Sequence, residues 1–323
     1  MVKWAGSDRK GVVFVISFLL LQEIAQLFVI LFFGWLLVRC RILKSSDSRI
    51  LSVVVLYLIF PCSVITSFQL ELTADRLRGM LLALIAAAVT LSIMFVLMAL
   101  LRRPLRLNTI EQASVFYSNA SNLTIPLVAS ILGPEWVIYV GMFIVIQQPI
   151  IWSHGRLLVS GQKQISLRNI ILNINVLSVM VGLALFLLQI TLPPLVQDTI
   201  NSVGTMIGPI CMIVAGMLMA NVDFRALVKH PGIWKTAFLR LILIPLVLIS
   251  VLKYSGLAAL APEGETILLV SLLSSITPTA NVVTQLAQVY GSGNDGEYAG
   301  SINVMTTLLC IVTIPLMIAF YQL

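Results

Sequence analysis

Charged residues are scarce in this chain of 323 residues. Asp, Glu, Lys and Arg make up 10% of it and hydrophobic residues 59%, whereas soluble domains carry about 25% charged residues. So few charges cannot cover the surface of a water-soluble protein, and the composition therefore indicates lipid as the solvent on most sides. The net charge of +7 is typical of basic cytoplasmic loops. We expect no nucleic-acid partner, because no basic patch is interleaved with exposed aromatic residues.

Groups that carry metal, redox or catalytic chemistry are equally few. The chain has two histidines and four cysteines, with no CxxC pair, so neither a zinc site nor a cofactor is expected. A Walker motif, an Asp-rich metal motif and a His/Glu pair are also missing. These absences argue against a primary pump and against an enzyme. A membrane-embedded enzyme and a structural or sensory membrane protein stay open as alternatives to a secondary carrier.

Long apolar runs are abundant. A helix that spans a bilayer needs about 20 mostly apolar residues, and ten stretches qualify. They are Val13–Val38, Ile50–Phe68, Met80–Leu101, Glu111–Leu132, Trp136–Trp152, Ile170–Ile190, Thr199–Ala220, Ile233–Leu252, Thr266–Val289 and Ala299–Tyr321. The first run is longer than the apolar core of a signal peptide, so we expect it to be retained. The sequence thus predicts an all-α integral membrane protein with ten transmembrane helices.

The basic residues predict how these helices are oriented. The odd-numbered loops hold thirteen Lys and Arg residues and the even-numbered loops hold three. Because cytoplasmic loops are enriched in Lys and Arg, the odd-numbered loops are predicted to face the cytoplasm and both termini the outside. Three basic residues before the first helix, Lys3, Arg9 and Lys10, argue for the opposite orientation. We give the internal loops more weight and predict a multi-pass protein of the cell membrane.

Prolines recur in the same order in the two halves of the chain. The pairs lie 148, 152 and 166 residues apart: Pro61 and Pro209, Pro126 and Pro278, Pro149 and Pro315. A repeat of five helices must be inverted, because an odd number of spans brings the second copy in from the opposite side. We predict a first repeat at residues 1–155, a cytoplasmic linker at 156–168 and a second repeat at 169–323. The alternative is that prolines are simply common in membrane helices.

The fourth and ninth predicted helices each carry small polar residues beside a proline. A proline opens a helix because it lacks an N–H and clashes with the preceding turn. Backbone freed in this way is tolerated in a membrane only where it is buried in protein or lines a wet cavity. Two opened helices would offer positive N-terminal ends to an anion. The candidate substrate-binding residues are Asn119, Ser121, Asn122, Thr124, Pro126, Thr277, Pro278, Thr279 and Asn281. The alternative is that they only join helices.

Charged groups near the membrane core are rare. Arg240 lies in the eighth predicted helix and is a further candidate for the binding site; it would either attract an anion or extend to the cytoplasmic interface. Glu23 is expected near the outer interface, with a role as proton carrier as the alternative. Glu111 is expected to be solvated at a helix end. Gln147 and Gln148 would line a cavity or pair with neighbours.

These motifs together resemble the auxin efflux carrier family of prokaryotes, related to the plant PIN proteins and to malate and malonate permeases. The family pattern in helix four is matched by Ser118, Asn119, Pro126 and Leu127, while Ser121 and Thr124 stand where the family has glycines. The segment 277–283 is similar to the family's Pro-x-x-Asn motif in helix nine. The resemblance covers essentially the whole chain.

The resemblance implies a fold like that of bile-acid symporters and sodium/proton antiporters. Such a fold has ten helices in a 5+5 inverted repeat, with helices four and nine broken and crossing. It also implies a small organic anion as substrate, with a carboxylate as the expected class. Proton or sodium coupling and a homodimer are left open. Because no carboxylate lies deep in helices four and nine, we expect no buried Asp/Glu pair for a coupling ion.

Overall fold

The computed structural model describes residues 25–161, 172, 174–220 and 230–322, and these are helical almost throughout. In chain order the α-helices are Ala25–Arg39, α2 (Ser48–Val54), α3 (Phe60–Ser67), α4 (Ala74–Leu101), α5 (Thr109–Phe116), α6 (Ile125–Ile131), α7 (Val137–Ile150), α8 (Arg156–Ser160), α10 (Ile174–Leu187), α11 (Pro194–Gly204), α12 (Ile207–Met219), α14 (Pro231–Phe238), α15 (Ile244–Tyr254), α16 (Gly264–Ile276), α17 (Asn281–Tyr290) and α18 (Asp295–Gln322). In these described ranges, four π-helical turns join some of them: η2 (Val55–Ile59), η3 (Ala120–Thr124), η5 (Ile151–Gly155) and η6 (Leu239–Leu243). Within the described residues, the one β-bridge joins Ser118 and Thr279.

Every predicted apolar stretch coincides with helix, as far as the described residues reach. Among the described residues, six helices are long and apolar enough to cross a membrane: Ser45–Ser67, Ala74–Leu101, Val137–Ser160, Pro194–Met219, Pro231–Tyr254 and Asp295–Gln322. Shorter apolar helices cover the remaining stretches. The fourth predicted stretch is interrupted and forms α5 and α6. The ninth is interrupted as well and forms α16 and α17. The beginning of the first stretch, including Glu23, lies outside the described residues.

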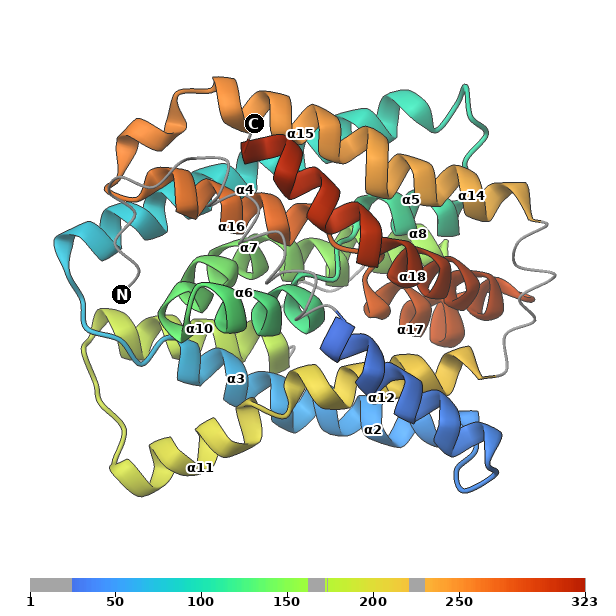
Figure 1. Cartoon of the computed structure of the whole chain (residues 1–323), viewed down its shortest axis with the longest axis horizontal. Coiled ribbons are helices and arrows are strands. Elements are labelled where there is room, and N and C mark those ends of the chain that lie inside the picture. Colours follow the sequence, from blue (N-terminus) through green and yellow to red (C-terminus); the bar gives the residue numbers. More distant parts are fainter. Residues whose placement is uncertain (1–24, 162–171, 173, 221–229, 323) are drawn as a thin grey trace.

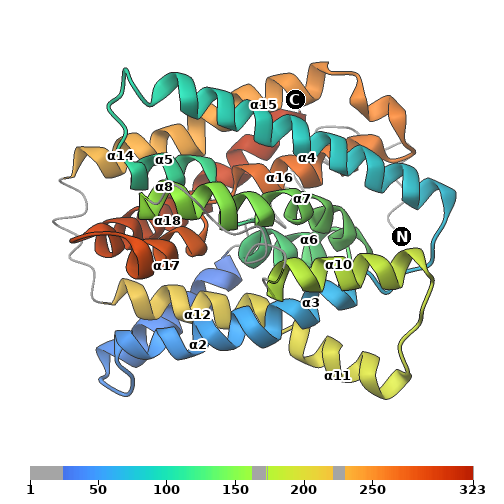
Figure 2. The same ribbon diagram turned by 180° about the vertical axis from the view of Figure 1, so that it is seen from behind.

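The helices form two groups, each of which draws on both halves of the chain (Figures 1 and 2). In the first, called here the scaffold group, α3 packs on α10 and α11, and α2 packs on α12. In the second, the crossover group, α4 packs on α7 and α16, α14 packs on α5 and α18, and α17 packs on α18. The scaffold group lies along the lower side of both views. α10 and α3 also contact α7 of the crossover group.

Three of the π-helical turns have a common cause in the sequence. A proline follows each of them, so that the turn is centred four residues before Pro61, Pro126 or Pro245. A proline cannot donate to the carbonyl four residues earlier, and its ring clashes with that carbonyl. One wider turn at that point relieves the clash, which is a usual origin of helix distortion. The sequence therefore determines where these membrane helices depart from α geometry.

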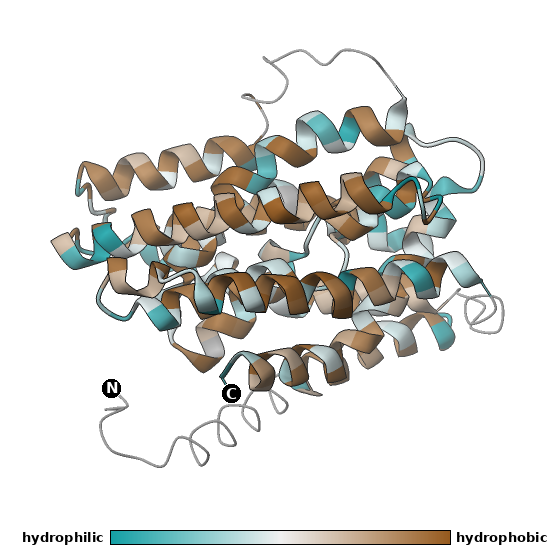
Figure 3. Cartoon of the chain, turned by 90° about the horizontal axis from the view of Figure 1, so that it is seen from above, coloured by the Kyte–Doolittle hydropathy of each residue, from teal (hydrophilic) through white to brown (hydrophobic). Residues whose placement is uncertain are grey.

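The outside of the molecule is as apolar as much of its inside. Large hydrophobic side chains remain exposed along α4, α10 and α18, for example at Leu81, Met180 and Leu316. Hydrophilic residues gather toward helix ends and loops, while the middle of the outer helices is hydrophobic (Figure 3). In water such a surface would associate without limit, whereas lipid tails solvate it. The fold therefore fits a membrane-embedded protein.

Glycines allow the helix Ala25–Arg39 to pack closely on α12 of the scaffold group. A Cβ atom added at Gly34 would collide with the backbone of Ile213, and one at Gly216 would collide with the backbone of Leu31. The helix Ala25–Arg39 and α12 therefore touch backbone to backbone. Small residues at such positions are the usual means by which membrane helices approach closely.

Candidate functional site

The first broken helix runs from α5 to α6. α5 begins with a capping box between Asn108 and Glu111 and ends at Phe116. The backbone is extended at Tyr117, with φ −88° and ψ 122°, and helix resumes at Ala120 as η3, which continues into α6 without interruption. Asn119 precedes this second half as its N-cap residue.

The second broken helix runs from α16 to α17. α16 ends at Ile276, the backbone is extended at Thr277 and Ala280, and α17 begins at Asn281. Pro278 explains the location of this break, because a residue before proline is disfavoured in the α region and proline itself has no N–H to donate. Both breaks therefore lie where the sequence analysis put polar residues beside a proline.

The two breaks cross each other as a minimal antiparallel pair. The N–H of Asn119 donates to the carbonyl of Pro278 at 2.9 Å, and the N–H of Ala280 donates to the carbonyl of Tyr117 at 3.0 Å. Ser118 and Thr279 face each other between these two bonds. In an antiparallel ladder such a pair points its own N–H and C=O groups outward. Buried outward groups need partners from elsewhere, because an unpaired backbone group in a membrane is costly.

Amide side chains from neighbouring helices supply those partners. Gln147 of α7 binds Ser118 on both sides: its Nε2 donates to the Ser118 carbonyl at 2.9 Å, and its Oε1 accepts from the Ser118 N–H at 3.1 Å and from its hydroxyl at 2.6 Å. On the other break, Asn303 of α18 donates to the Thr279 carbonyl at 2.8 Å, and Thr306 accepts from the Thr279 N–H at 3.3 Å. The two breaks are thus held in equivalent ways.

Arg240 satisfies the carbonyls where the first half of each broken helix ends. Its Nε donates to the carbonyl of Thr277 at 2.9 Å, one terminal nitrogen to that of Val115 at 3.1 Å and the other to that of Ser275 at 2.6 Å. The side chain is fully buried. Its predicted alternative of extending to the cytoplasmic interface is therefore wrong. Attraction of an anion stays a prediction.

The remaining candidate residues fall into two classes. Thr277 and Thr279 use their hydroxyls inside the protein: Thr279 Oγ1 donates to the Ser114 carbonyl at 3.0 Å, and Thr277 Oγ1 to the Ser274 carbonyl at 3.4 Å. Pro278 is buried, and Pro126 is half-buried and lies against Gly208 of α12. The residues that keep polar groups available are Asn119, Ser121, Asn122, Thr124 and Asn281.

The first break leaves more of its polar groups available than the second, where the Thr284 hydroxyl of α17 is buried without a partner among the described residues. Asn119 is 4% exposed and makes no side-chain cap bond to the helix it precedes. Thr124 Oγ1 is buried and has no hydrogen-bond partner among the described residues. Asn281 Oδ1 accepts from Asn303 at 3.0 Å, which leaves the Asn281 NH₂ group to donate elsewhere. Together with the first N–H groups of two helices, these donors can hold a negatively charged group.

Sequence reasoning did not assign a role to Asn303, Thr306 or Ser114. It left Gln147 between lining a cavity and pairing with a neighbour, and the contacts with Ser118 agree with pairing. The available signal was positional: Gln147 and Asn303 lie in the helices that follow the two breaks in the two halves. Gln148 lies beside Gln147, and its Oε1 is buried without a partner among the described residues.

A second polar cluster lies where α5, α14 and α18 begin. Glu111 is 3% exposed, so the expectation that it is solvated is wrong. Lys235 pairs with it at 3.0 Å, and Tyr298 donates to its other oxygen at 2.8 Å. The N–H of Asn108 also donates to Glu111. A carboxylate at a helix N-terminus is favoured electrostatically, and here it also ties together three helices of the crossover group.

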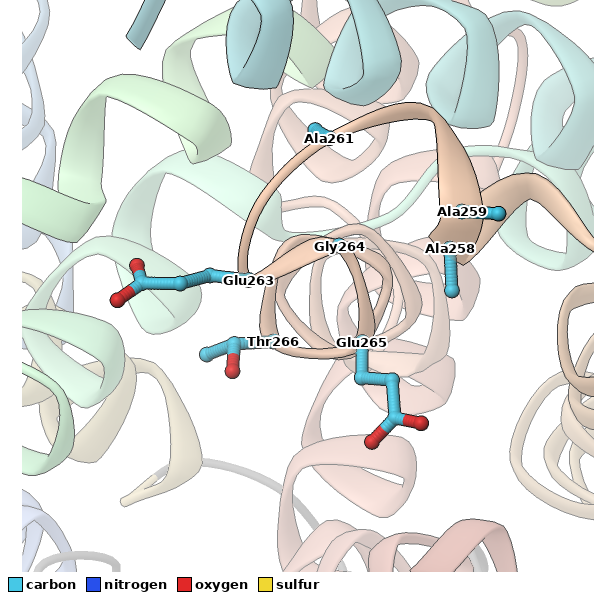
Figure 4. A pocket seen from close by; sticks show the side chains of 7 residues that line it. All are labelled: Ala258, Ala259, Ala261, Glu263, Gly264, Glu265 and Thr266. Carbon is cyan, nitrogen blue, oxygen red and sulfur yellow. The ribbon is translucent and has the colours of Figure 1, made fainter. Parts of the chain in front are cut away.

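A surface hollow of about 460 Å³ lies at the other end of α16 from the break (Figure 4). It is lined by Ala258, Ala259, Ala261, Glu263, Gly264, Glu265 and Thr266. The 13-residue helix α16 rises about 1.5 Å per residue, which places the hollow roughly 18 Å from the crossing segments. It is open and lies away from the donors described above. Within the described part of the chain, no group of three His, Cys, Asp or Glu residues could hold a metal ion.

Comparison with known proteins agrees with this architecture. A search of the curated proteins finds no match. The family model described as membrane transport protein matches residues 19–318, which is nearly the whole chain. The resemblance to auxin efflux carriers is confirmed at this level of the family, and a particular relation to PIN proteins or to malate permeases stays a prediction. The chain is a membrane protein that belongs to the membrane transport protein family.

Proposed function

We propose that the chain is a secondary transporter of a small organic anion, of which a carboxylate is the expected class. The observation that carries this proposal is the antiparallel crossing of two broken helices at Ser118 and Thr279. It brings the N-terminal ends of η3 and α17 and the free donors of Asn119 and Asn281 to one place in the membrane. Such half-helix ends are how many transporters hold anionic substrates.

The proposed mechanism is alternating access around this crossing. Two packed groups, one bearing the crossing and one without it, are the components that such a mechanism needs. Each group combines elements of both halves, which supports ten spans in a 5+5 inverted repeat at residues 1–155 and 169–323, joined by 156–168. Substrate contacts are proposed for Asn119, Ser121, Asn122, Thr124 and Asn281. The other candidates, Thr277, Thr279, Pro126 and Pro278, would shape the break.

Coupling and assembly follow the same proposal. Any proton or sodium coupling would use backbone carbonyls and amide or hydroxyl oxygens, or the proton of the substrate itself, because Glu111 is already paired with Lys235. A homodimer is compatible with the exposed apolar faces of the scaffold group.

The plasma membrane, with both termini outside, is the proposed location. The exposed Cys40 tests the orientation, because it follows the helix Ala25–Arg39 in a loop predicted to be cytoplasmic. We expect no reaction of Cys40 with a membrane-impermeant maleimide in intact cells and full reaction after permeabilisation. Reaction in intact cells would reverse the orientation.

Transport itself is tested with purified protein in proteoliposomes. We expect accumulation of at least one labelled mono- or dicarboxylate from a panel, which an enzyme or a sensory protein would not produce. Asn119→Ala and Asn281→Ala should lower affinity for that acid about ten- to a hundred-fold, because a hydrogen bond to a charged group contributes roughly 1.5–3 kcal/mol.

The thermal stability of the same two variants separates binding from packing. If these side chains only join helices, both variants lose stability and keep their affinity. Unchanged affinity in both variants would mean that Asn119 and Asn281 at the crossing do not bind the substrate. Uptake of no acid by the native protein would contradict the proposed function itself.

A further inference from the structure

Arg240 has a fully buried side chain in this conformation. Because not even water touches it, a substrate in the crossing could not contact it either. The three guanidinium nitrogens instead donate to carbonyls at the ends of α5 and α16. The carbonyl ends of both first half-helices therefore converge on one cation.

The charges at the crossing can be counted. A helix end carries roughly half an elementary charge, negative at its C-terminus and positive at its N-terminus. Two C-terminal ends, those of α5 and α16, add up to about one negative charge, which Arg240 balances. The N-terminal ends of η3 and α17 then leave about one positive charge for a ligand. Without the arginine, the partial negative charges of the two C-terminal ends would cancel the partial positive charges of the two N-terminal ends.

Three other basic side chains that pack on the crossover group are already engaged. His154 is hydrogen-bonded to the Tyr117 hydroxyl at 2.7 Å, and Arg156 lies over the ring of Tyr290, at the end of α17 away from the crossing. Lys235, the cation closest to Arg240 in sequence on the same predicted span, is paired with Glu111. The buried groups that remain for a ligand are uncharged: Asn119 is 4% exposed without a cap bond, and Thr124 Oγ1 is buried without a partner in the part of the chain that the structure describes. A second buried carboxylate on the ligand would have to be desolvated with no cation to pair with, which is strongly unfavourable.

We propose that Arg240 is a positioning residue that sets the charge of the crossing without touching substrate, and that the crossing selects an anion with a single negative charge. This inference rests on the proposed transport function and narrows it from carboxylates in general to monocarboxylates. It separates the chain from permeases for dicarboxylates such as malate and malonate, to which the sequence motifs are also similar.

Matched probes test the charge of the ligand. Binding to the purified full-length protein in lipid nanodiscs is measured at neutral pH by calorimetry for phenylacetate, phenylmalonate and phenylacetamide, and for propionate, malonate and propionamide. We expect the monoanion of a set to bind at least about tenfold more tightly than its dianion and its amide. A dianion that binds as tightly as its monoanion, while acids are still taken up by proteoliposomes, overturns this inference and leaves the transport proposal standing. Absence of both binding and uptake overturns the two together.

Variants of Arg240 test how the residue acts. In R240Q we expect the preference for the acid over its amide to fall about tenfold or more, and R240K to restore most of it by keeping the charge. Lys253→Gln, which removes an exposed charge from α15 of the same span, is the control and should keep the preference. An unchanged preference in R240Q overturns the proposal. If R240Q cannot be purified, the preference of R240K for the acid over its amide is the test, and loss of that preference in R240K overturns the proposal.

Hydrogen exchange without ligand distinguishes positioning from contact. The amides of Asn119 and Ala280 donate across the crossing, so their exchange should speed up in R240Q even in the absence of any anion. A residue that only contacts substrate would leave this exchange as it is in the native protein, and that result would overturn the positioning role.

Discussion

The two breaks differ in how their polar groups are used, although they are joined symmetrically. In the second break the hydroxyl of Thr279 donates to Ser114, and the amide oxygen of Asn281 accepts from Asn303. In the first break the amide of Asn119 makes no cap bond, and the hydroxyl of Thr124 has no partner among the described residues. The second break is therefore bonded mostly to the protein, while the first retains groups that a ligand can use.

This difference suggests a division of labour between the halves. A carbonyl at the end of α5 normally lacks a helical donor, and Thr279 and Arg240 from the second half supply donors for Ser114 and Val115. The second half thus stabilises the break of the first. The first half can then keep polar side chains unpaired, at an energetic cost that a bound substrate would relieve.

The largest expected effect concerns the residue that binds the first break on both sides. Gln147→Leu would leave the buried N–H, carbonyl and hydroxyl of Ser118 without their partner. Because each of these three unsatisfied buried groups costs about 1–3 kcal/mol, we expect a loss of about 3–9 kcal/mol in the free energy of unfolding. The measurement is denaturation of the purified variant in detergent. Gln147→Glu, measured at acidic pH, is the control: its protonated carboxyl keeps an acceptor and an O–H donor for Ser118, and its loss of stability should be smaller.

A smaller loss is expected for the equivalent residue of the second break. Asn303→Leu removes one donor from the Thr279 carbonyl and from Asn281, while Thr306 still accepts from the Thr279 N–H. Asn281 is half-buried and can find water instead. We expect a loss of about 1–3 kcal/mol. If Asn303→Leu were more destabilising than Gln147→Leu, the first break would not be the more dependent of the two.

Much of this architecture follows from patterns that the sequence carries openly. Apolar runs of sufficient length predicted the helices, and proline beside small polar residues predicted both breaks, because these signals are local. The ends of the helices were displaced by a few residues: the last one begins at Asp295 and not at Ala299. Local patterns cannot show whether a helix frays into polar residues or continues through them.

The partners of the breaks were less predictable, because they come from distant parts of the chain. Arg240 lies 125 residues from Val115 and Gln147 lies 29 residues from Ser118. Glu111 was misjudged for the same reason, since its partners Lys235 and Tyr298 belong to other helices. A buried polar residue in a membrane must have a partner, but the sequence alone does not say which one.

Two threonines, one from each half, provide an isosteric comparison between the breaks. Thr279→Val removes the hydroxyl that donates to the Ser114 carbonyl at 3.0 Å. That carbonyl cannot regain its helical donor, because the N–H of Ser118 is bonded to Gln147. We therefore expect a loss of about 1–2 kcal/mol in stability, with the affinity for a transported acid nearly unchanged. A large loss of affinity without loss of stability would show that this hydroxyl serves the ligand instead.

Thr124→Val should have the smallest effect on the fold and the opposite effect on binding. The Thr124 hydroxyl is buried without a partner among the described residues, so an isosteric methyl group removes an unsatisfied polar atom and should leave stability unchanged or raise it by up to about 1 kcal/mol. If the ligand is what satisfies this hydroxyl, affinity for the acid should fall about three- to tenfold, since a neutral hydrogen bond contributes roughly 0.5–1.5 kcal/mol.

Denaturation and ligand titration of Thr124→Val and Thr279→Val give the change in stability and the change in affinity for each variant. Opposite patterns in the two variants would support a first break open to the ligand and a second break committed to the protein. Equal losses of stability in both would mean that Thr124 has a structural partner, and the asymmetry between the breaks would then rest on Asn119, Ser121 and Asn122.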